Sequence, residues 1–326
     1  MKTARMVSLS ELGNADVIKL IDKELPDPSK GEVQLRQTAI GFNFIDVYQR
    51  SGVYPLELPS GLGHEAVGVV EALGEGVSRF KMGDRVMYMN AGIGAYASAR
   101  NVAVDKLVAV PDNVSDEVAA AVFFKAMTAQ YLIQKTYKVK SGDVVLVHAA
   151  AGGVGQILAG WAKSLGAFVV GTVGSEAKFA VAKEAGCDAV VDYSKPNWVE
   201  EVLKATGGRK ANVVYDSVAK TTFLGSLDCV APFGMLALFG AASGPPPEIQ
   251  PEILNKKGCL FLTRPSVFPH NATPELLQEN ARAVFDAIAQ GRVKVKIGAK
   301  FSLEQAAEAH KAAEGRKVSG AIVITP

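Results

Sequence analysis

The spacing of hydrophobic and polar residues divides the chain near residue 141. Before it, apolar and polar residues alternate over 33–40, and further short β-rich stretches lie at 67–73 and 85–89. Alternation with period two predicts half-buried strands. Clusters of Pro, Gly, Ser and Asp separate these stretches, and short strands with frequent turns favour a compact barrel over a βαβ array.

From residue 141 to about 265, strand patterns alternate with helical ones. The first strand contains four consecutive apolar β-formers, Val144 to Val147. A run without polar residues predicts a strand buried on both faces, as in a parallel sheet. Because helical stretches separate most of the strands, the pattern predicts an open, doubly wound sheet. The strand candidates are 144–148, 168–173, 189–192, 212–216, 235–239 and 260–262.

Two helices are expected between these regions. Ser115 is suited to cap a helix over 115–122, and a longer helix is predicted over 125–138. After residue 267, a helix is predicted over 274–290 and a last strand over 318–324.

The last 60 residues show no βαβ repeat, so we expect them to return to the first domain. The predicted fold is therefore α/β, with a discontinuous first domain, 1–124 and 267–326, and a second domain, 125–266.

Composition narrows the possible functions only slightly. The chain has 326 residues, of which 48% are hydrophobic and 21% charged, as in ordinary globular proteins. A net charge of +2 gives no reason to expect nucleic acid or an anionic membrane as a partner. No apolar run reaches the ~18 residues that span a bilayer. The three cysteines are far apart and form no C-x-x-C motif. We therefore expect no disulfide framework and a cytoplasmic location.

A glycine-rich turn follows the first buried strand. Gly152, Gly153 and Gly155 lie between this strand and a helical stretch. This order suits a diphosphate, because backbone can approach the phosphates where there is no Cβ and the helix N–H groups face the anion. Ala150 to Gly155 is an altered form of the dinucleotide fingerprint G-x-G-x-x-G. The hexamer alone also fits a turn without a ligand, but the flanking strand and helix favour a dinucleotide.

The segments 41–54, 142–155 and 213–217 resemble the medium-chain dehydrogenase/reductases, and most closely the zinc-independent quinone oxidoreductases related to zeta-crystallin. The resemblance runs essentially from end to end, although Gly160 stands where the family often has Gln. It implies a GroES-like β-barrel catalytic domain, a Rossmann domain and a cofactor between them. It also implies a homodimer formed through the edge strand near 260–262.

His64 raises the question of zinc. It lies in a segment, 63–77, with the spacing of the zinc alcohol dehydrogenase signature. Zinc relatives have cysteines at Asn43 and near Lys125, and neither thiolate is present. Residues 88–100 also contain no cysteine, so the lobe that binds structural zinc is missing. Because a catalytic zinc needs about three protein ligands, we predict no zinc and a hydrogen-bonded His64.

The end of the second Rossmann strand favours NADPH over NADH. NAD-specific folds usually place an acidic residue there, whereas this chain has Gly174 and Ser175. Ser175 and Lys178 could bind a 2′-phosphate, although Lys178 could also be a solvated helix residue and Glu176 is acidic. The resemblance also implies that Tyr193 and Arg316 lie near this phosphate. It further implies that the backbone of residues 44–46, with Thr128, contacts the nicotinamide half of the cofactor. The predicted cofactor-binding residues are Phe44, Ile45, Asp46, Thr128, Gly152, Gly153, Val154, Gly174, Ser175, Lys178, Tyr193, Ser217, Phe239, Gly240, Ala241 and Arg316.

Without zinc, the expected substrate is one that accepts electrons readily, such as a quinone or another conjugated carbonyl. The cofactor delivers hydride, and a hydrogen-bond donor near the developing oxyanion assists. The candidate catalytic residues are Asn43, Tyr48, Tyr54 and Lys125, with packing as the alternative role for the tyrosines. We expect His148 to make a structural hydrogen bond.

The predicted activity is NADPH-dependent quinone reduction. The alternatives are an NADPH-dependent enone or alkenal reductase and a non-catalytic NADPH-binding protein.

Overall fold

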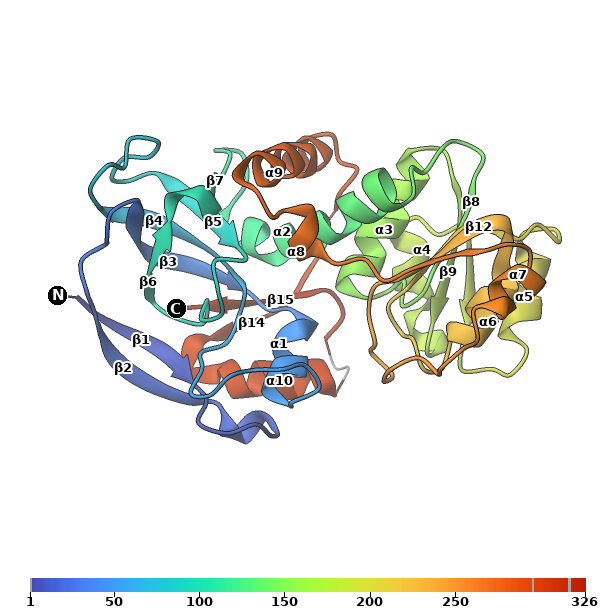
Figure 1. Ribbon diagram of the computed structural model, residues 1–326, viewed down its shortest axis with the longest axis horizontal. Coiled ribbons are helices and arrows are strands. Elements are labelled where there is room, and N and C mark those ends of the chain that lie inside the picture. The colour runs from blue at the N-terminus through green and yellow to red at the C-terminus, as the bar shows by residue number, and fades with distance from the viewer. Residues whose placement is uncertain (1, 295, 316–317) are drawn as a thin grey trace. The chain divides into compact units, whose positions relative to one another are not determined.

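The computed structural model describes residues 2–294, 296–315 and 318–326. The chain forms two compact units, each of which is described by itself (Figure 1). Unit 1 consists of Met1–Lys125, Asn271–Ala281 and Val295–Pro326. Unit 2 consists of Ala126–His270 and Arg282–Lys294. Two long helices, α2 (Asp116–Tyr131) and α9 (Pro274–Ala289), contain residues of both units.

Unit 1 is built on a seven-stranded sheet with the order β14-β15-β3-β4-β5-β7, in which β6 also pairs with β3. The last strand, β15, runs antiparallel to β3 and aligns Val323 with Gly41. The C-terminal strand therefore pairs with an N-terminal strand in one sheet. The elements are β1 (Lys2–Ser8), β2 (Lys19–Leu25), β3 (Glu32–Gly41), α1 (Phe44–Arg50), β4 (Glu65–Leu73), β5 (Arg85–Met89), β6 (Ala99–Ala103), β7 (Leu107–Ala109), β14 (Ile297–Ser302), α10 (Ala306–Glu314) and β15 (Ala321–Thr325).

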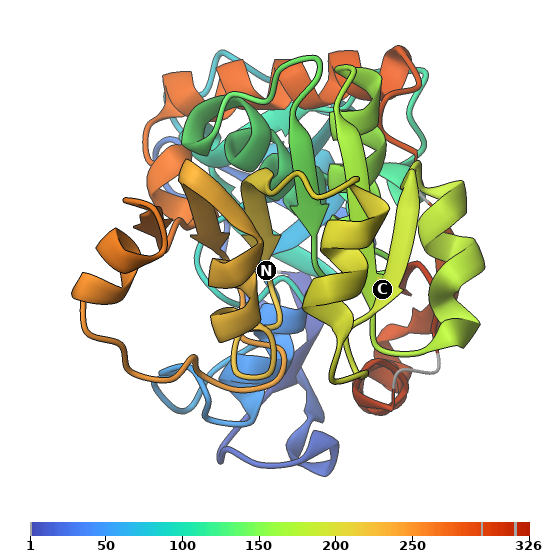
Figure 2. The same cartoon turned by 90° about the vertical axis from the view of Figure 1, so that its right-hand side faces the viewer.

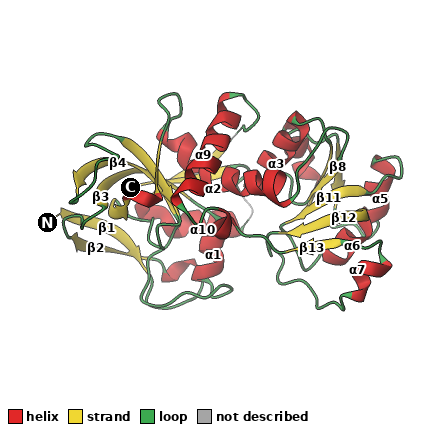
Figure 3. Ribbon diagram, turned by 45° about the horizontal axis from the view of Figure 1, so that its top comes forward, coloured by secondary structure: helices red, strands yellow, loops and turns green. Residues whose placement is uncertain are grey.

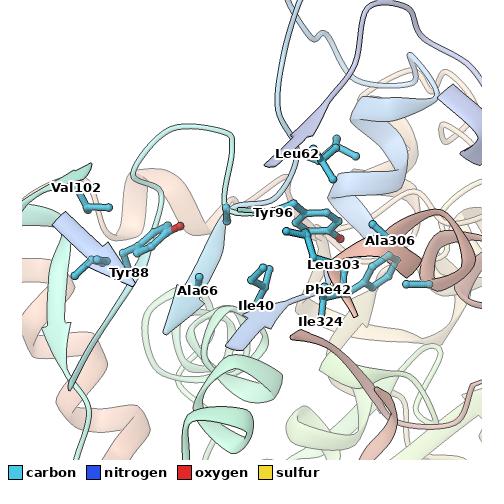
Figure 4. Packing of buried hydrophobic residues seen from close by; sticks show 14 of the residues in the cluster. Ile40, Phe42, Leu62, Ala66, Tyr88, Tyr96, Val102, Leu303, Ala306 and Ile324 are labelled. Atoms are coloured by element: carbon cyan, nitrogen blue, oxygen red, sulfur yellow. The ribbon is translucent and has the colours of Figure 1, made fainter. Parts of the chain in front are cut away.

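The core of unit 1 combines side chains of the strands with side chains of α10 and of the loops between the strands. Ile40, Tyr96 and Ile324 come from distant parts of the sequence and are fully buried. Figure 4 shows them close to Phe42 and Leu303. Each large apolar side chain buried in this way contributes about 1.5–3 kcal/mol. This packing fixes the carboxyl end of β3, where α1 begins.

Unit 2 contains a six-stranded sheet with the order β10-β9-β8-β11-β12-β13, and all of its strand pairs are parallel. The first strand of unit 2, β8, lies in the middle of the sheet. β9 and β10 follow on one side of β8, and β11, β12 and β13 follow on the other side. Helices cover both faces of the sheet (Figures 2 and 3). The elements are β8 (Val144–Val147), α3 (Gly153–Ser164), β9 (Phe168–Val173), α4 (Phe179–Glu184), β10 (Ala189–Asp192), α5 (Trp198–Ala205), β11 (Ala211–Asp216), α6 (Phe223–Cys229), β12 (Val230–Leu238), α7 (Glu252–Lys256), β13 (Phe261–Thr263) and α8 (Val267–His270).

The predicted α/β fold class is confirmed, but one helix boundary is wrong. The segments 115–122 and 125–138 are not two helices. One helix, α2, runs through both, and a π-helical segment, Leu132–Thr136, follows it. Neither Gly nor Pro stands at residues 123 and 124, so nothing there interrupts the helix.

Candidate functional site

The turn between β8 and α3 has the geometry expected for a diphosphate site. Gly152 directly precedes α3 and is extended, with φ −80° and ψ 169°. A Cβ at Gly155 would lie 2.2 Å from the carbonyl oxygen of Ala149. The helix can therefore begin this close to the strand only because residue 155 is glycine. The first N–H groups of a helix lack intrahelical partners, so this turn can bind an anion.

A second group of predicted cofactor residues lies at the ends of β9 and β10. These strands align Val173 with Asp192, so Gly174 and Tyr193 follow them side by side. A Cβ at Gly174 would lie 2.9 Å from the Tyr193 hydroxyl oxygen. Ser175 directly precedes a short 3₁₀ helix, Glu176–Lys178. The structure thus brings Gly174, Ser175, Lys178 and Tyr193 into one region, whereas Arg316 lies outside the described residues.

The third group lies at the ends of β11 and β12. The Phe239 N–H donates to the Asp216 carbonyl oxygen at 2.8 Å. A Cβ at Gly240 would lie 2.6 Å from the Ser217 carbonyl oxygen, so the two segments are in close contact. All three groups lie at the carboxyl edge of the parallel sheet, on either side of the point where the chain reverses direction. Dinucleotides bind at this place in doubly wound sheets.

Two residues that shape this edge were missed by the sequence analysis. Asp216 is fully buried and accepts hydrogen bonds from the N–H groups of Val218 at 2.8 Å and Ala219 at 3.0 Å. The guanidinium of Arg264 donates to the carbonyl oxygens of Leu238 at 2.8 Å and Gly240 at 3.2 Å. Asp216 could have been suspected, because a carboxylate at the end of a buried strand needs nearby donors.

His148 has the structural role that the sequence predicts. Its ring is fully buried, with Nδ1 2.7 Å from the Thr172 hydroxyl and Nε2 2.9 Å from the Ser226 hydroxyl. Burial lowers the pKa of His148.

Thr128, another predicted cofactor-binding residue, also belongs to unit 2 and is buried in α2.

In unit 1, a polar cluster of Asn43, Glu65 and Lys125 lies at the start of α1. Lys125 Nζ donates to the Phe42 carbonyl oxygen at 2.9 Å and to Asn43 Oδ1 at 3.1 Å. Asn43 Nδ2 donates to Glu65 Oε1 at 2.8 Å. The three side chains are buried, although they are far apart in the sequence. The structure thus brings together two of the predicted catalytic residues, Asn43 and Lys125, and adds Glu65.

Burial and charge oppose each other in the polar cluster. Burial lowers the pKa of Lys125, and the nearby carboxylates of Glu65 and Asp46 partly offset this effect. Burial raises the pKa of Glu65, while Lys125 and two N–H donors favour its ionised form. Both Glu65 oxygens accept N–H hydrogen bonds, which is the pattern of a carboxylate. We therefore treat Glu65 and Lys125 as an ion pair.

At the start of α1, the side chain of Asp46 is buried and that of Phe44 is exposed. Asp46 is fully buried and accepts hydrogen bonds from the Asn43 N–H at 3.0 Å and the Tyr96 hydroxyl at 3.1 Å. Burial raises the pKa of Asp46 to about 7. The side chain of Asp46 therefore holds the helix start, and only its backbone is suited to a cofactor contact. Phe44, in contrast, is 43% exposed.

The two candidate tyrosines belong to an aromatic cluster formed by Phe44, Tyr48 and Tyr54. The ring centroids of Phe44 and Tyr48 are 5.4 Å apart, and those of Tyr48 and Tyr54 are 5.1 Å apart. The two tyrosines are half-buried. The rings therefore pack on one another and still present partly accessible aromatic surface.

The surroundings of His64 do not suit a zinc ligand set. Its Nε2 is 2.9 Å from Gln49 Oε1, and burial lowers its pKa to about 4. The cation next to Glu65 is the Lys125 ammonium, whose Nζ lies 3.8 Å from Glu65 Oε1. No group of three or more His, Cys, Asp or Glu residues in the described ranges could hold a metal ion.

A doubly wound parallel-sheet domain combined with a mostly antiparallel β-domain is the architecture of the medium-chain dehydrogenase/reductase class. Comparison with known families agrees: residues 29–112 match the alcohol dehydrogenase GroES-like domain, and residues 153–291 match the zinc-binding dehydrogenases.

Individual relatives narrow this class. The chain is 45% identical over 324 residues to a quinone oxidoreductase of Pseudomonas aeruginosa, covering 99% of this chain and 100% of the relative. It is 42% identical over 321 residues to a 2-haloacrylate reductase of a Burkholderia species, covering 96% of each. The crystal structure of Escherichia coli quinone oxidoreductase complexed with NADPH superposes with a TM-score of 0.95 at 42% identity, covering 99% of this chain and 100% of that one. The chain belongs to the quinone oxidoreductases of the medium-chain dehydrogenase/reductase superfamily.

None of the helices in the described ranges is both long and apolar enough to cross a membrane.

Proposed function

We propose that this chain reduces quinones with NADPH and that Lys125, held in the polar cluster of Asn43, Glu65 and Lys125, donates a hydrogen bond to the substrate oxygen. The activity and the cofactor are those of its family: the predicted NADPH:quinone oxidoreductase is confirmed by the quinone oxidoreductase relatives and by the NADPH complex of the E. coli enzyme.

The cofactor site rests on the three residue groups at the carboxyl edge of the unit 2 sheet. Gly152, Gly153 and Val154 are suited to the diphosphate, and Gly174, Ser175, Lys178 and Tyr193 to the 2′-phosphate. Ser217 and Phe239 to Ala241 border the opposite side of the same edge. The close packing at Gly155 supports this assignment, because it brings helix N–H groups next to the strand end. NADPH, when bound, supplies a hydride.

The geometry of Lys125 carries the proposed substrate site. An ammonium has three N–H donors. Two of them donate to Phe42 and Asn43, and Glu65 Oε1 lies 3.8 Å from Nζ, which is an ion-pair distance and too long for a hydrogen bond. The third N–H can therefore donate to a substrate oxygen. As hydride reaches a quinone, negative charge develops on its oxygen, and a preorganised donor stabilises that charge. The exposed aromatic surface of Phe44, Tyr48 and Tyr54 is suited to a flat quinone ring.

Replacement of Lys125 by Met tests this role. Loss of one preorganised donor typically costs about 10²–10³-fold in kcat. We expect such a fall with 1,4-benzoquinone, and an unchanged Kd for NADPH measured by fluorescence. Lys30→Met is the control, because the Lys30 side chain is 78% exposed. An unchanged kcat in Lys125→Met would refute the proposed role.

The second candidate substrate class is the activated alkenes. The 2-haloacrylate reductase relative supports it, because reduction of such an alkene also places charge on a conjugated oxygen. A panel of quinones and enones, with NADPH oxidation followed at 340 nm, separates the two classes. NADPH binding without turnover on any acceptor would instead indicate the non-catalytic alternative.

We also propose a cytoplasmic homodimer formed through β13. This strand ends the unit 2 sheet and has no partner on its outer side in the described part of the chain. Phe261 and Leu262 are 59% and 36% exposed, so the edge is apolar. Such an edge is prone to pair with another strand. Three unpaired cysteines suit a reducing compartment. Light scattering of the purified chain measures the oligomeric state.

A further inference from the structure

The carboxylate of Glu65 connects three segments of unit 1. It lies at the start of β4 and is fully buried. Oε1 accepts a hydrogen bond from Asn43 Nδ2 at 2.8 Å, and Oε2 accepts one from the Phe124 backbone N–H at 2.8 Å. Lys125 Nζ lies 3.8 Å from Oε1. One carboxylate thus holds β4, the start of α1 and the middle of α2 together.

The space for this carboxylate depends on the neighbouring strand. A Cβ at Gly41 would lie 2.3 Å from Glu65 Oε1 and 2.3 Å from the Ala120 carbonyl oxygen. Any side chain at residue 41 would therefore displace either the carboxylate or the helix. The Phe124 N–H is also unusual, because an N–H inside a helix normally donates to the carbonyl four residues earlier. Two backbone features thus accommodate Glu65.

The hydrogen bonds of Glu65 fix the orientation of the Asn43 amide. Because Nδ2 of Asn43 donates to Glu65, Oδ1 is the atom that faces Lys125 Nζ. If the Asn43 amide were reversed, its NH₂ group would face the Lys125 ammonium. Both groups are hydrogen-bond donors, so no hydrogen bond could form between them. The carboxylate also places a negative charge beside an ammonium that burial would otherwise disfavour.

We propose that Glu65 is a positioning residue for quinone reduction, which orients the Asn43 amide and keeps the Lys125 ammonium charged and in place to donate to the substrate oxygen. Glu65 does this from outside the substrate site, through Asn43 and Lys125. This inference rests on the proposed function of Lys125.

Replacement of Glu65 by Gln tests the inference through the pH profile of kcat. An opposite charge within about 4–6 Å shifts a pKa by about 1–3 units. We therefore expect the alkaline fall of kcat to begin at least about one pH unit lower in Glu65→Gln, with kcat at neutral pH reduced about tenfold to a hundredfold. The Kd for NADPH should not change. Glu71→Gln is the matched control, because Glu71 lies on the same strand and is partly exposed.

Two further variants keep the test decisive. Glu65→Asp retains the charge, so its alkaline limb should stay near that of the wild type even if its kcat is lower, and it provides the test if Glu65→Gln does not fold. The double variant Glu65→Gln/Lys125→Met should be no slower than Lys125→Met alone, because Glu65 acts through Lys125. An unshifted alkaline limb in Glu65→Gln, or fully additive losses in the double variant, would overturn the inference. A normal kcat in Lys125→Met would instead refute the proposed substrate site itself.

Discussion

The turn between β8 and α3 allows a quantitative test of the cofactor site. In Gly155→Ala, the added Cβ would lie 2.2 Å from the Ala149 carbonyl oxygen and 2.8 Å from the Ala150 Cα. Non-bonded heavy atoms normally stay about 3.5 Å apart, so the start of α3 must move away from the strand by about 1 Å. Overpacking of this kind costs about 1–3 kcal/mol of folding free energy.

The same movement withdraws the first N–H groups of α3 from the phosphates. A hydrogen bond to a charged group contributes about 1.5–3 kcal/mol. Loss of one such bond therefore raises the Kd for NADPH about tenfold to a hundredfold, since 1.4 kcal/mol corresponds to a factor of ten. Fluorescence titration measures the Kd, and circular dichroism measures the thermal midpoint.

Gly160→Ala is the control on the same helix. A Cβ at Gly160 would lie 3.1 Å from the Ala185 carbonyl oxygen, so a shift of a few tenths of an ångström accommodates it. Alanine also gains up to about 1 kcal/mol over glycine inside a helix. We expect nearly unchanged NADPH binding in this variant. Equal Kd values for Gly155→Ala and the wild type would refute the proposal that the first N–H groups of α3 bind the phosphates. Equally weakened NADPH binding in Gly155→Ala and Gly160→Ala would refute it too.

Two other predictions concern cofactor preference and acid stability. Lys178→Ala should raise the Michaelis constant for NADPH much more than that for NADH, because only NADPH carries the 2′-phosphate; equal effects in steady-state assays would remove Lys178 from the phosphate site. His310 is fully buried, and burial lowers its pKa from 6.5 to about 3. The unfolded chain thus takes up this proton at higher pH, so the stability that His310 contributes is present above pH 6.5 and is lost as the pH falls below it. Asp46 acts in the opposite direction, because its raised pKa favours the folded state at low pH. Comparison with His310→Gln isolates the histidine: between pH 7 and pH 5, urea unfolding should show about 2 kcal/mol more loss of stability in the wild type. Parallel pH curves for the two proteins would contradict this assignment.

Local sequence patterns determined most of the secondary structure. The strands predicted over 85–89, 168–173 and 189–192 have the same bounds in the structure. The turn after β8 could also be predicted, because strand, glycines and helix follow one another directly in the chain. These features depend on residues that are neighbours in sequence, so their periodicity and backbone preferences suffice to predict them.

The polar cluster in unit 1 was decided by the tertiary structure. Asn43 and Lys125 became candidates through resemblance to a family, but no sequence spacing indicated that Glu65 joins them. Glu65 was visible only as the residue after His64, and the structure turns the His64 side chain to Gln49 instead. Hydrogen bonds between residues 22 and 82 positions apart depend on how β3, β4 and α2 pack. Local sequence patterns cannot predict that packing. The charges of Glu65 and Lys125 are buried next to each other only when the whole unit has folded.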